Sequence, residues 1–125
     1  MWTIKVESEF AAAHFLSHYN GKCENLHGHN YRVRVWAEGS ELDEGGMLLD
    51  FGALKAALRE VLFEFDHTNL NDNVYFNGDP SAERIARCIF EKLSDEMARR
   101  GLPQTLLSAV DIYETPGSMA RFTKS

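Results

Sequence analysis

The stretch Phe10–Tyr31, FAAAHFLSHYNGKCENLHGHNY, decides the fold and the chemistry expected of this chain. It holds four of the protein's five histidines, and its centre is His27-Gly28-His29. Apolar residues continue on the histidine side at every second position: Tyr31, Val33, Val35 and Ala37. A period of two is typical of a strand with one buried face. Both histidines are therefore predicted to point to the core side of a strand over residues 27–39.

The chain before this stretch predicts a second strand, over residues 1–15, with His14 in its apolar phase. If the two strands pair antiparallel, His14, His27 and His29 meet on one face near the strand ends. Three neutral imidazoles with an open fourth position are typical of catalytic zinc, whereas structural zinc is normally closed by four protein ligands. We therefore predict a zinc site at these three histidines, although an HxH pair in a strand is by itself more often incidental.

Length and composition indicate a single cytoplasmic domain over residues 1–125. The two cysteines, Cys23 and Cys88, lie far apart without CxxC spacing, as in a reducing compartment. No apolar run is long enough for a membrane span, and the charges at Lys5, Glu7 and Glu9 argue against a signal peptide. The net charge of -6 argues against nucleic acid as a main partner.

Two helices are predicted in the middle of the chain. The first begins after an N-cap at Asp50 and ends near Asp66, and the second runs from Pro80 or Ser81 to a left-handed cap at Gly101. A short stretch at 47–49 is expected to extend a strand. Two more strands are predicted at 106–114 and 118–123.

The resulting β-β-α-α-β-β order predicts an α+β fold, in which two helices cover one face of an antiparallel sheet. The other face would carry charged residues and suits water. A four-stranded sheet has two edges that need protection, and extension of the sheet between subunits is one way to provide it. We therefore expect a homo-oligomer.

Other polar residues could add to the zinc chemistry. Cys23 lies in a polar loop, where it could act as a base, as a nucleophile or as a fourth zinc ligand. Asp66-His67 is either a helix-end cap or a carboxylate-oriented proton relay. Glu114 shares the inward phase of its strand, so it is either exposed at the strand end or bound by two donors of a ligand with a guanidine-like edge.

The chain resembles the 6-pyruvoyl-tetrahydropterin synthase family in a series of motifs that run through nearly its whole length. These motifs are AAAHFL, CENLHGHNY, LLDFGALK, DHTNLND, PSAE and IYET. The most similar branch is that of the bacterial 6-carboxy-5,6,7,8-tetrahydropterin synthases of queuosine (7-deazaguanine) biosynthesis. CxxxHGH together with DHxxLND is highly specific.

This resemblance implies the tunnelling fold (T-fold), in which subunits join their sheets into trimeric barrels that commonly stack into hexamers. It implies Zn²⁺ as cofactor, bound by His14, His27 and His29. It also implies that Cys23 is the catalytic base, that Asp66 and His67 form a relay supplied across a subunit boundary, and that Glu114 binds the pterin. Lys22, Arg32 and Arg34 are candidates for the triphosphate site.

The implied activity is a carbon–carbon and carbon–oxygen lyase reaction. It would convert 7,8-dihydroneopterin triphosphate and water to 6-carboxy-5,6,7,8-tetrahydropterin, acetaldehyde and triphosphate. Glu24 follows Cys23 to give CExxHGH, which leaves open a folate-pathway cleavage to 6-hydroxymethyl-dihydropterin. The pyruvoyl-forming reaction is a further alternative, and a zinc-stabilised pterin-binding module without turnover is the non-enzymatic one.

Overall fold

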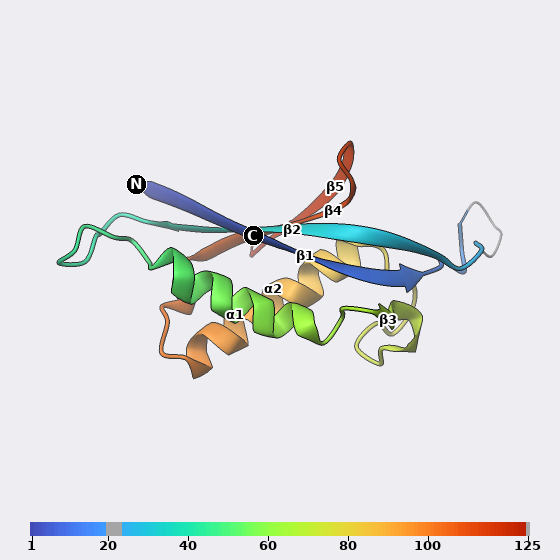
Figure 1. The fold of residues 1–125 in the computed structure, drawn as a ribbon. Helices are drawn as coiled ribbons and strands as arrows, with labels where there is room; N and C mark the ends of the chain where they lie inside the picture. Colours follow the sequence, from blue (N-terminus) through green and yellow to red (C-terminus); the bar gives the residue numbers. More distant parts are fainter. Residues whose placement is uncertain (20–23, 125) are drawn as a thin grey trace.

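The chain forms one five-stranded sheet that carries both α-helices on the same face (Figure 1). The computed structural model describes residues 1–19 and 24–124. The elements are β1 (Trp2–His14), β2 (His27–Gly39), α1 (Phe51–Phe63), β3 (Thr68–Asn69), η1 (Leu70–Asp72), α2 (Ala82–Arg99), η2 (Gln104–Leu106), β4 (Leu107–Thr115) and β5 (Ser118–Thr123). The sheet order is β3-β1-β2-β4-β5. The predicted α+β architecture is confirmed.

The two long strands β1 and β2 pair antiparallel over their whole length, from Trp2 opposite Gly39 to His14 opposite His27. Their alternation places one set of side chains under the helices. The buried members of this set are Val6, Phe10, Ala12, His14, Tyr31, Val33, Val35 and Ala37. The helices cover them with the apolar stripes of α1 and α2, so the core lies between one sheet face and two helices.

The opposite sheet face carries a network of charged side chains. Arg32 lies 3.3 Å from a Glu7 oxygen and 3.4 Å from a Glu9 oxygen. Arg34 contacts Glu7 at 3.2 Å and donates a hydrogen bond of 3.0 Å to the Tyr113 hydroxyl. Both arginines are thus paired on the face away from the helices. They also line one pocket with Glu114, and their role at the triphosphate stays a prediction.

The helix boundaries follow the capping residues in the sequence. Asp50 is the N-cap of α1 and accepts a hydrogen bond of 2.9 Å from the Ala53 amide. Ser81 caps α2 in the same way, by accepting from the Arg84 amide. Gly101 has a φ of 74°, the left-handed conformation expected after α2.

Loss of the α1 cap should weaken the fold measurably. Asp50→Ala leaves the Ala53 amide without its acceptor, so we expect the free energy of unfolding to fall by about 1 kcal/mol. Chemical denaturation followed by circular dichroism would measure the change. Glu60→Ala, on the exposed side of the same helix, is the control and should stay within about 0.5 kcal/mol of wild type. Equal stability of Asp50→Ala and wild type would refute the capping role.

Three details differ from the sequence expectation. Residues 47–49 form no strand, and α1 ends at Phe63, before a turn that leads to His67. The third difference is β3, a two-residue strand that pairs parallel with Ala12 and Ala13, so the sheet is not wholly antiparallel. In the described ranges, 1–19 and 24–124, no helix is long and apolar enough to cross a membrane.

Candidate metal centre

The register of β1 and β2 brings three imidazoles together. His14 pairs directly with His27, and His29 lies opposite Ala12, so all three side chains project from the helix-covered face. Ring centroids are 4.6 Å apart for His14 and His27, 5.1 Å for His14 and His29, and 4.8 Å for His27 and His29. One ring nitrogen from each lies within 4.8 Å of the others. The structure thus juxtaposes the three predicted ligands.

Backbone carbonyls fix which nitrogen of two of these rings carries the proton. His14 Nδ1 lies 2.9 Å from the Pro80 carbonyl oxygen, and His27 Nδ1 lies 2.8 Å from that of Asn25. Because a carbonyl only accepts, each Nδ1 must donate. The lone pairs of the neutral rings are therefore on the Nε2 atoms, which face each other at 3.0 Å. Two facing acceptors need a cation or a proton between them, and such carbonyl-oriented imidazoles are typical metal ligands.

His29 completes this donor set in a form that suits a metal. Burial lowers the pKa of His29, and the neighbouring His14 and His27 act in the same direction, while Glu114 opposes them. A lowered pKa favours the neutral imidazole, which is the form that binds metal. Chemistry and geometry of the three rings therefore fit a divalent transition metal such as zinc.

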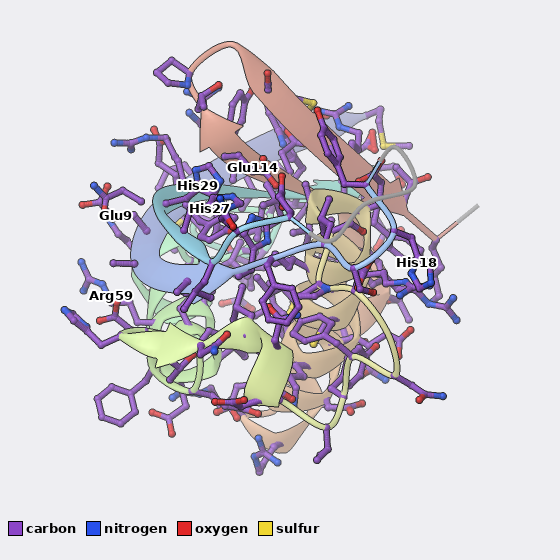
Figure 2. The ribbon with its side chains drawn as sticks, turned by 90° about the vertical axis from the view of Figure 1, so that its right-hand side faces the viewer. Glu9, His18, His27, His29, Arg59 and Glu114 are labelled. Carbon is purple, nitrogen blue, oxygen red and sulfur yellow. The ribbon has the colours of Figure 1, made fainter. Side chains whose placement is uncertain are left out.

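Glu114, near the end of β4, lies directly beside the imidazoles (Figure 2). Its Oε1 is 4.0 Å from His14 Nε2, and its Oε2 is 3.8 Å from His29 Nε2. The side chain is 28% exposed. The inward phase predicted from the sequence is therefore observed, and it brings a carboxylate to the edge of the candidate metal centre.

Asp66 and His67 form a second polar group, at the edge of β1. One Asp66 oxygen accepts from the Ala11 amide at 2.9 Å, and the other lies 3.0 Å from His67 Nδ1. The Ala11 amide, with a smaller contribution from His67, lowers the pKa of Asp66. The ionised carboxylate holds the His67 ring with Nε2 available. His67 has a φ of 60°, an uncommon conformation outside glycine that often marks functional residues.

The His67 ring does not reach the three imidazoles within one chain. Its side chain is 83% exposed. Across residues 1–19 and 24–124, no hydrogen bond, ion pair or ring contact joins His67 to His14, His27 or His29. His67 and His29 do line the same shallow pocket, over the edge of β1.

Cys23 and Lys22 lie outside the residues that the structure describes. The next residue, Glu24, is described. The Glu24 amide donates to the Leu16 carbonyl at 2.8 Å, and Glu24 Oε1 accepts from the Leu16 amide at 3.1 Å. The same Oε1 is 4.0 Å from His27 Nδ1. Glu24, the residue that makes the motif CExxHGH, thus lies on the Nδ1 side of one predicted ligand.

Some site residues could not be found from the sequence. The carbonyls of Pro80 and Asn25 have no side-chain signature. Tyr31 lies two residues after His29, and its inward phase was the available signal. Its ring is fully buried 5.4 Å from that of His29, and its hydroxyl has no hydrogen-bond partner among the described residues. Burial raises the pKa of Tyr31, with Glu114 and Glu24 adding to the effect.

Asp79 binds the segment that follows β1, at Ser17 and His18, through hydrogen bonds. Its carboxylate accepts from the Ser17 amide at 2.8 Å, from the Ser17 hydroxyl at 2.6 Å and from the His18 amide at 3.2 Å. These donors, the Ser17 hydroxyl foremost, lower the pKa of Asp79 to about 2. The segment thus depends on an ionised Asp79, next to the Pro80 carbonyl that orients His14.

The contribution of Asp79 to stability should depend on pH. Its folded pKa of about 2 lies below the ordinary value of 3.8, so the contribution is complete above about pH 4 and is lost as the pH falls toward 2. We expect Asp79→Asn to have a lower melting temperature than wild type at pH 7, with a difference that shrinks below pH 4. Thermal unfolding between pH 2.5 and 7 would test this. A difference independent of pH would contradict it.

A sequence model described as 6-pyruvoyl tetrahydropterin synthase matches residues 3–125. The chain belongs to this family. The 6-carboxy-5,6,7,8-tetrahydropterin synthase of Synechocystis sp. is 41% identical to it over 127 residues, which cover 98% of this chain and 93% of the relative. The protein of the same name from Bacillus subtilis is 34% identical, over 92% of this chain and 80% of the relative.

The family's solved structures have the same fold as this chain. The structure of Caenorhabditis elegans 6-pyruvoyl tetrahydropterin synthase superimposes with a TM-score of 0.86 at 31% identity, covering 99% of this chain and 96% of the other. The chain therefore has the tunnelling fold of the 6-pyruvoyl tetrahydropterin synthase family. The family resemblance seen in the sequence motifs is confirmed.

Proposed function

We propose that this protein is a 6-carboxy-5,6,7,8-tetrahydropterin synthase of queuosine (7-deazaguanine) biosynthesis. Its substrates would be 7,8-dihydroneopterin triphosphate and water. Its products would be 6-carboxy-5,6,7,8-tetrahydropterin, acetaldehyde and triphosphate. The observation that carries the proposal is the convergence of His14, His27 and His29 on one volume beside Glu114. The names of the Synechocystis and Bacillus relatives support the choice of reaction.

The three imidazoles would hold the metal, which we infer to be zinc. Bound zinc supplies a Lewis acid that makes the hydroxyls and adjacent carbons of the substrate side chain more acidic. Cys23 would remove a proton from that side chain as general base. His67 Nε2 would shuttle a proton back, while Asp66 keeps the ring in one tautomer by accepting from Nδ1. Glu114 would accept from the pterin 2-amino group and ring N–H, a bidentate pairing that orients the substrate.

We further propose that residues 1–125 act as one domain within a cytoplasmic homotrimer or homohexamer whose active sites lie at subunit interfaces. Two observations support this assembly. Within the described part of the chain, β1 pairs with β3 only at Ala12 and Ala13, so most of one edge has no strand partner, and β5 is the other edge. His67 projects from the β1 edge with 83% of its side chain exposed, which suits a role in a neighbouring site.

Two other functions remain as alternatives with distinct products. Glu24 lies beside His27 and favours the folate-pathway cleavage to 6-hydroxymethyl-dihydropterin, alone or in addition. The pyruvoyl-forming reaction would retain all carbons of the side chain. A zinc-stabilised pterin-binding module would bind the substrate and convert nothing.

Product analysis separates these functions. The zinc-loaded protein is incubated with 7,8-dihydroneopterin triphosphate, and the products are identified by mass spectrometry with a separate assay for acetaldehyde. Acetaldehyde with 6-carboxytetrahydropterin is the expected result. A 6-hydroxymethyl or a 6-pyruvoyl product without acetaldehyde would replace the proposed reaction with one of the alternatives, and unchanged substrate would leave only the binding module.

A further inference from the structure

Among the described residues, the Glu114 carboxylate faces the candidate metal centre without a hydrogen-bond donor that would hold it there. Its two oxygens point to different rings, Oε1 to His14 at 4.0 Å and Oε2 to His29 at 3.8 Å. Within residues 1–19 and 24–124, no hydrogen-bond donor contacts it, and the side chain is only 28% exposed. Even partial burial of a carboxylate without donors is costly, so its position needs an explanation.

Neither ring that Glu114 faces supplies the missing donor. Neutral His14 carries no proton on Nε2, and His29 Nε2 lies 3.8 Å from the carboxylate, beyond hydrogen-bond distance. The proton of His14 is on Nδ1, where it is bound by the Pro80 carbonyl, and the lone pair on Nε2 faces the carboxylate. His27 likewise directs its Nε2 lone pair at His14. Several acceptors, one of them an anion, thus surround the same volume. They repel one another unless a cation lies between them, and a divalent metal satisfies them all.

We propose that Glu114 is the fourth ligand of this metal before substrate binds, and that it leaves the metal when the pterin arrives. Ligand atoms on a tetrahedral zinc are separated by about 3.4 Å, given bond lengths of about 2.0–2.1 Å. The observed separations, 3.8 Å from His29 and 4.0 Å from His14, exceed this value by less than about 1 Å but belong to different oxygens, so the carboxylate must move toward the rings to bring one oxygen to the metal. This inference deepens the proposed function, because it gives Glu114 a role before it binds the pterin edge.

The exchange would link substrate recognition to access to the metal. A pterin offers Glu114 two N–H donors in a fork, which can compete with a single carboxylate–metal bond. When Glu114 turns to that fork, a coordination position opens beside the three imidazoles, where the substrate side chain can enter. Molecules without a guanidine-like edge would leave Glu114 in place. Without substrate, Glu114 would occupy the fourth coordination position of the metal. Only molecules with a guanidine-like edge would free that position.

Zinc affinity without any pterin tests the ligand role directly. Wild type, Glu114→Gln and Glu24→Gln are prepared metal-free, checked for folding by circular dichroism, and titrated with zinc in competition with a chromophoric chelator. Glu24→Gln is a matched control, because Glu24 also lies 4.0 Å from an imidazole nitrogen of the cluster, but from the Nδ1 of His27 that already donates to a carbonyl.

We expect Glu114→Gln to weaken zinc binding at least about 10-fold, as loss of a ligand should cost no less than loss of a group that orients one. Glu24→Gln should change the affinity less than about 3-fold, since it removes a neighbouring charge and keeps a side-chain oxygen that can accept from the Leu16 amide. Equal affinities of Glu114→Gln and wild type would overturn the proposal. Equal losses in both variants would also overturn it, because they would reveal a general effect of charge.

A cobalt-substituted protein tests the exchange. Unsubstituted pterin, which has no side chain to offer the metal, should change the visible absorption of wild-type Co²⁺ protein toward that of Glu114→Gln. An unchanged wild-type spectrum at saturating pterin would refute the exchange. Neither measurement depends on turnover, so both can be interpreted even if the product assay shows no activity. If wild type bound no metal, this inference and the proposed function would both fall.

Discussion

Replacing His27 by alanine is expected to abolish zinc binding and to lower kcat/KM of the proposed lyase at least about 1,000-fold. His27 Nε2 lies 3.0 Å from His14 Nε2, at the point where the three rings converge. Without it, two imidazoles remain, which is fewer than the three protein ligands of known catalytic zinc sites. Metal content and steady-state kinetics on the same preparations would measure both effects.

His18→Ala is the matched control for this experiment. His18 lies in the same stretch of sequence, but its side chain is 91% exposed, and it contacts Ser17 and Asp79 rather than the metal centre. Figure 2 shows it apart from His27 and His29. We expect zinc content to be unchanged and kcat/KM to stay within about 3-fold of wild type. Full zinc occupancy and full activity of His27→Ala would remove the basis of the proposed function.

The second large effect is expected from His67, with a different signature. His67→Asn should lower kcat by about 100- to 10,000-fold, the range typical of a lost general acid or base. Zinc content should not change, because His67 makes no contact with the three imidazoles among the described residues. Asparagine is chosen because it tolerates the φ of 60° observed here better than most side chains. Normal kcat in this variant would refute the relay.

Mixing the two inactive proteins tests whether His67 acts across a subunit boundary. In co-assembled His27→Ala and His67→Asn subunits, some sites combine an intact His27 from one chain with an intact His67 from its neighbour. Random mixing in equal amounts gives about one such site in four, so about a quarter of wild-type activity should return. No recovery on mixing, with mixed oligomers verified by mass spectrometry, would place the relay within one chain.

The sequence predicted the elements with strong periodicity and missed those without it. The alternation in residues 27–39 and the apolar stripes of the helices correspond to β2, α1 and α2. The two-residue strand β3 is too short to have a period, and it exists because Asp66 and His67 bind the Ala11 backbone. Tertiary hydrogen bonds of this kind leave no local pattern.

The candidate site likewise contains features that the sequence predicted and features that it could not predict. The phase of His14, His27 and His29 predicted that they share a face, and the strand register then brings them together. The Pro80 carbonyl that orients His14 comes from a segment 66 residues away and contributes only backbone. The closeness of Glu114 to the rings also depends on the pairing of β4 with β2, which its inward phase alone could not give.

The exposed position of His67 has a consequence for the cell. If His67 serves the active site of a neighbouring subunit, an isolated subunit binds the metal but has no proton relay beside it. Such a subunit has no lyase activity. Newly made chains could then bind zinc early without releasing an aldehyde before they find their partners. Dilution below the dissociation constant of the oligomer would then switch the catalyst off.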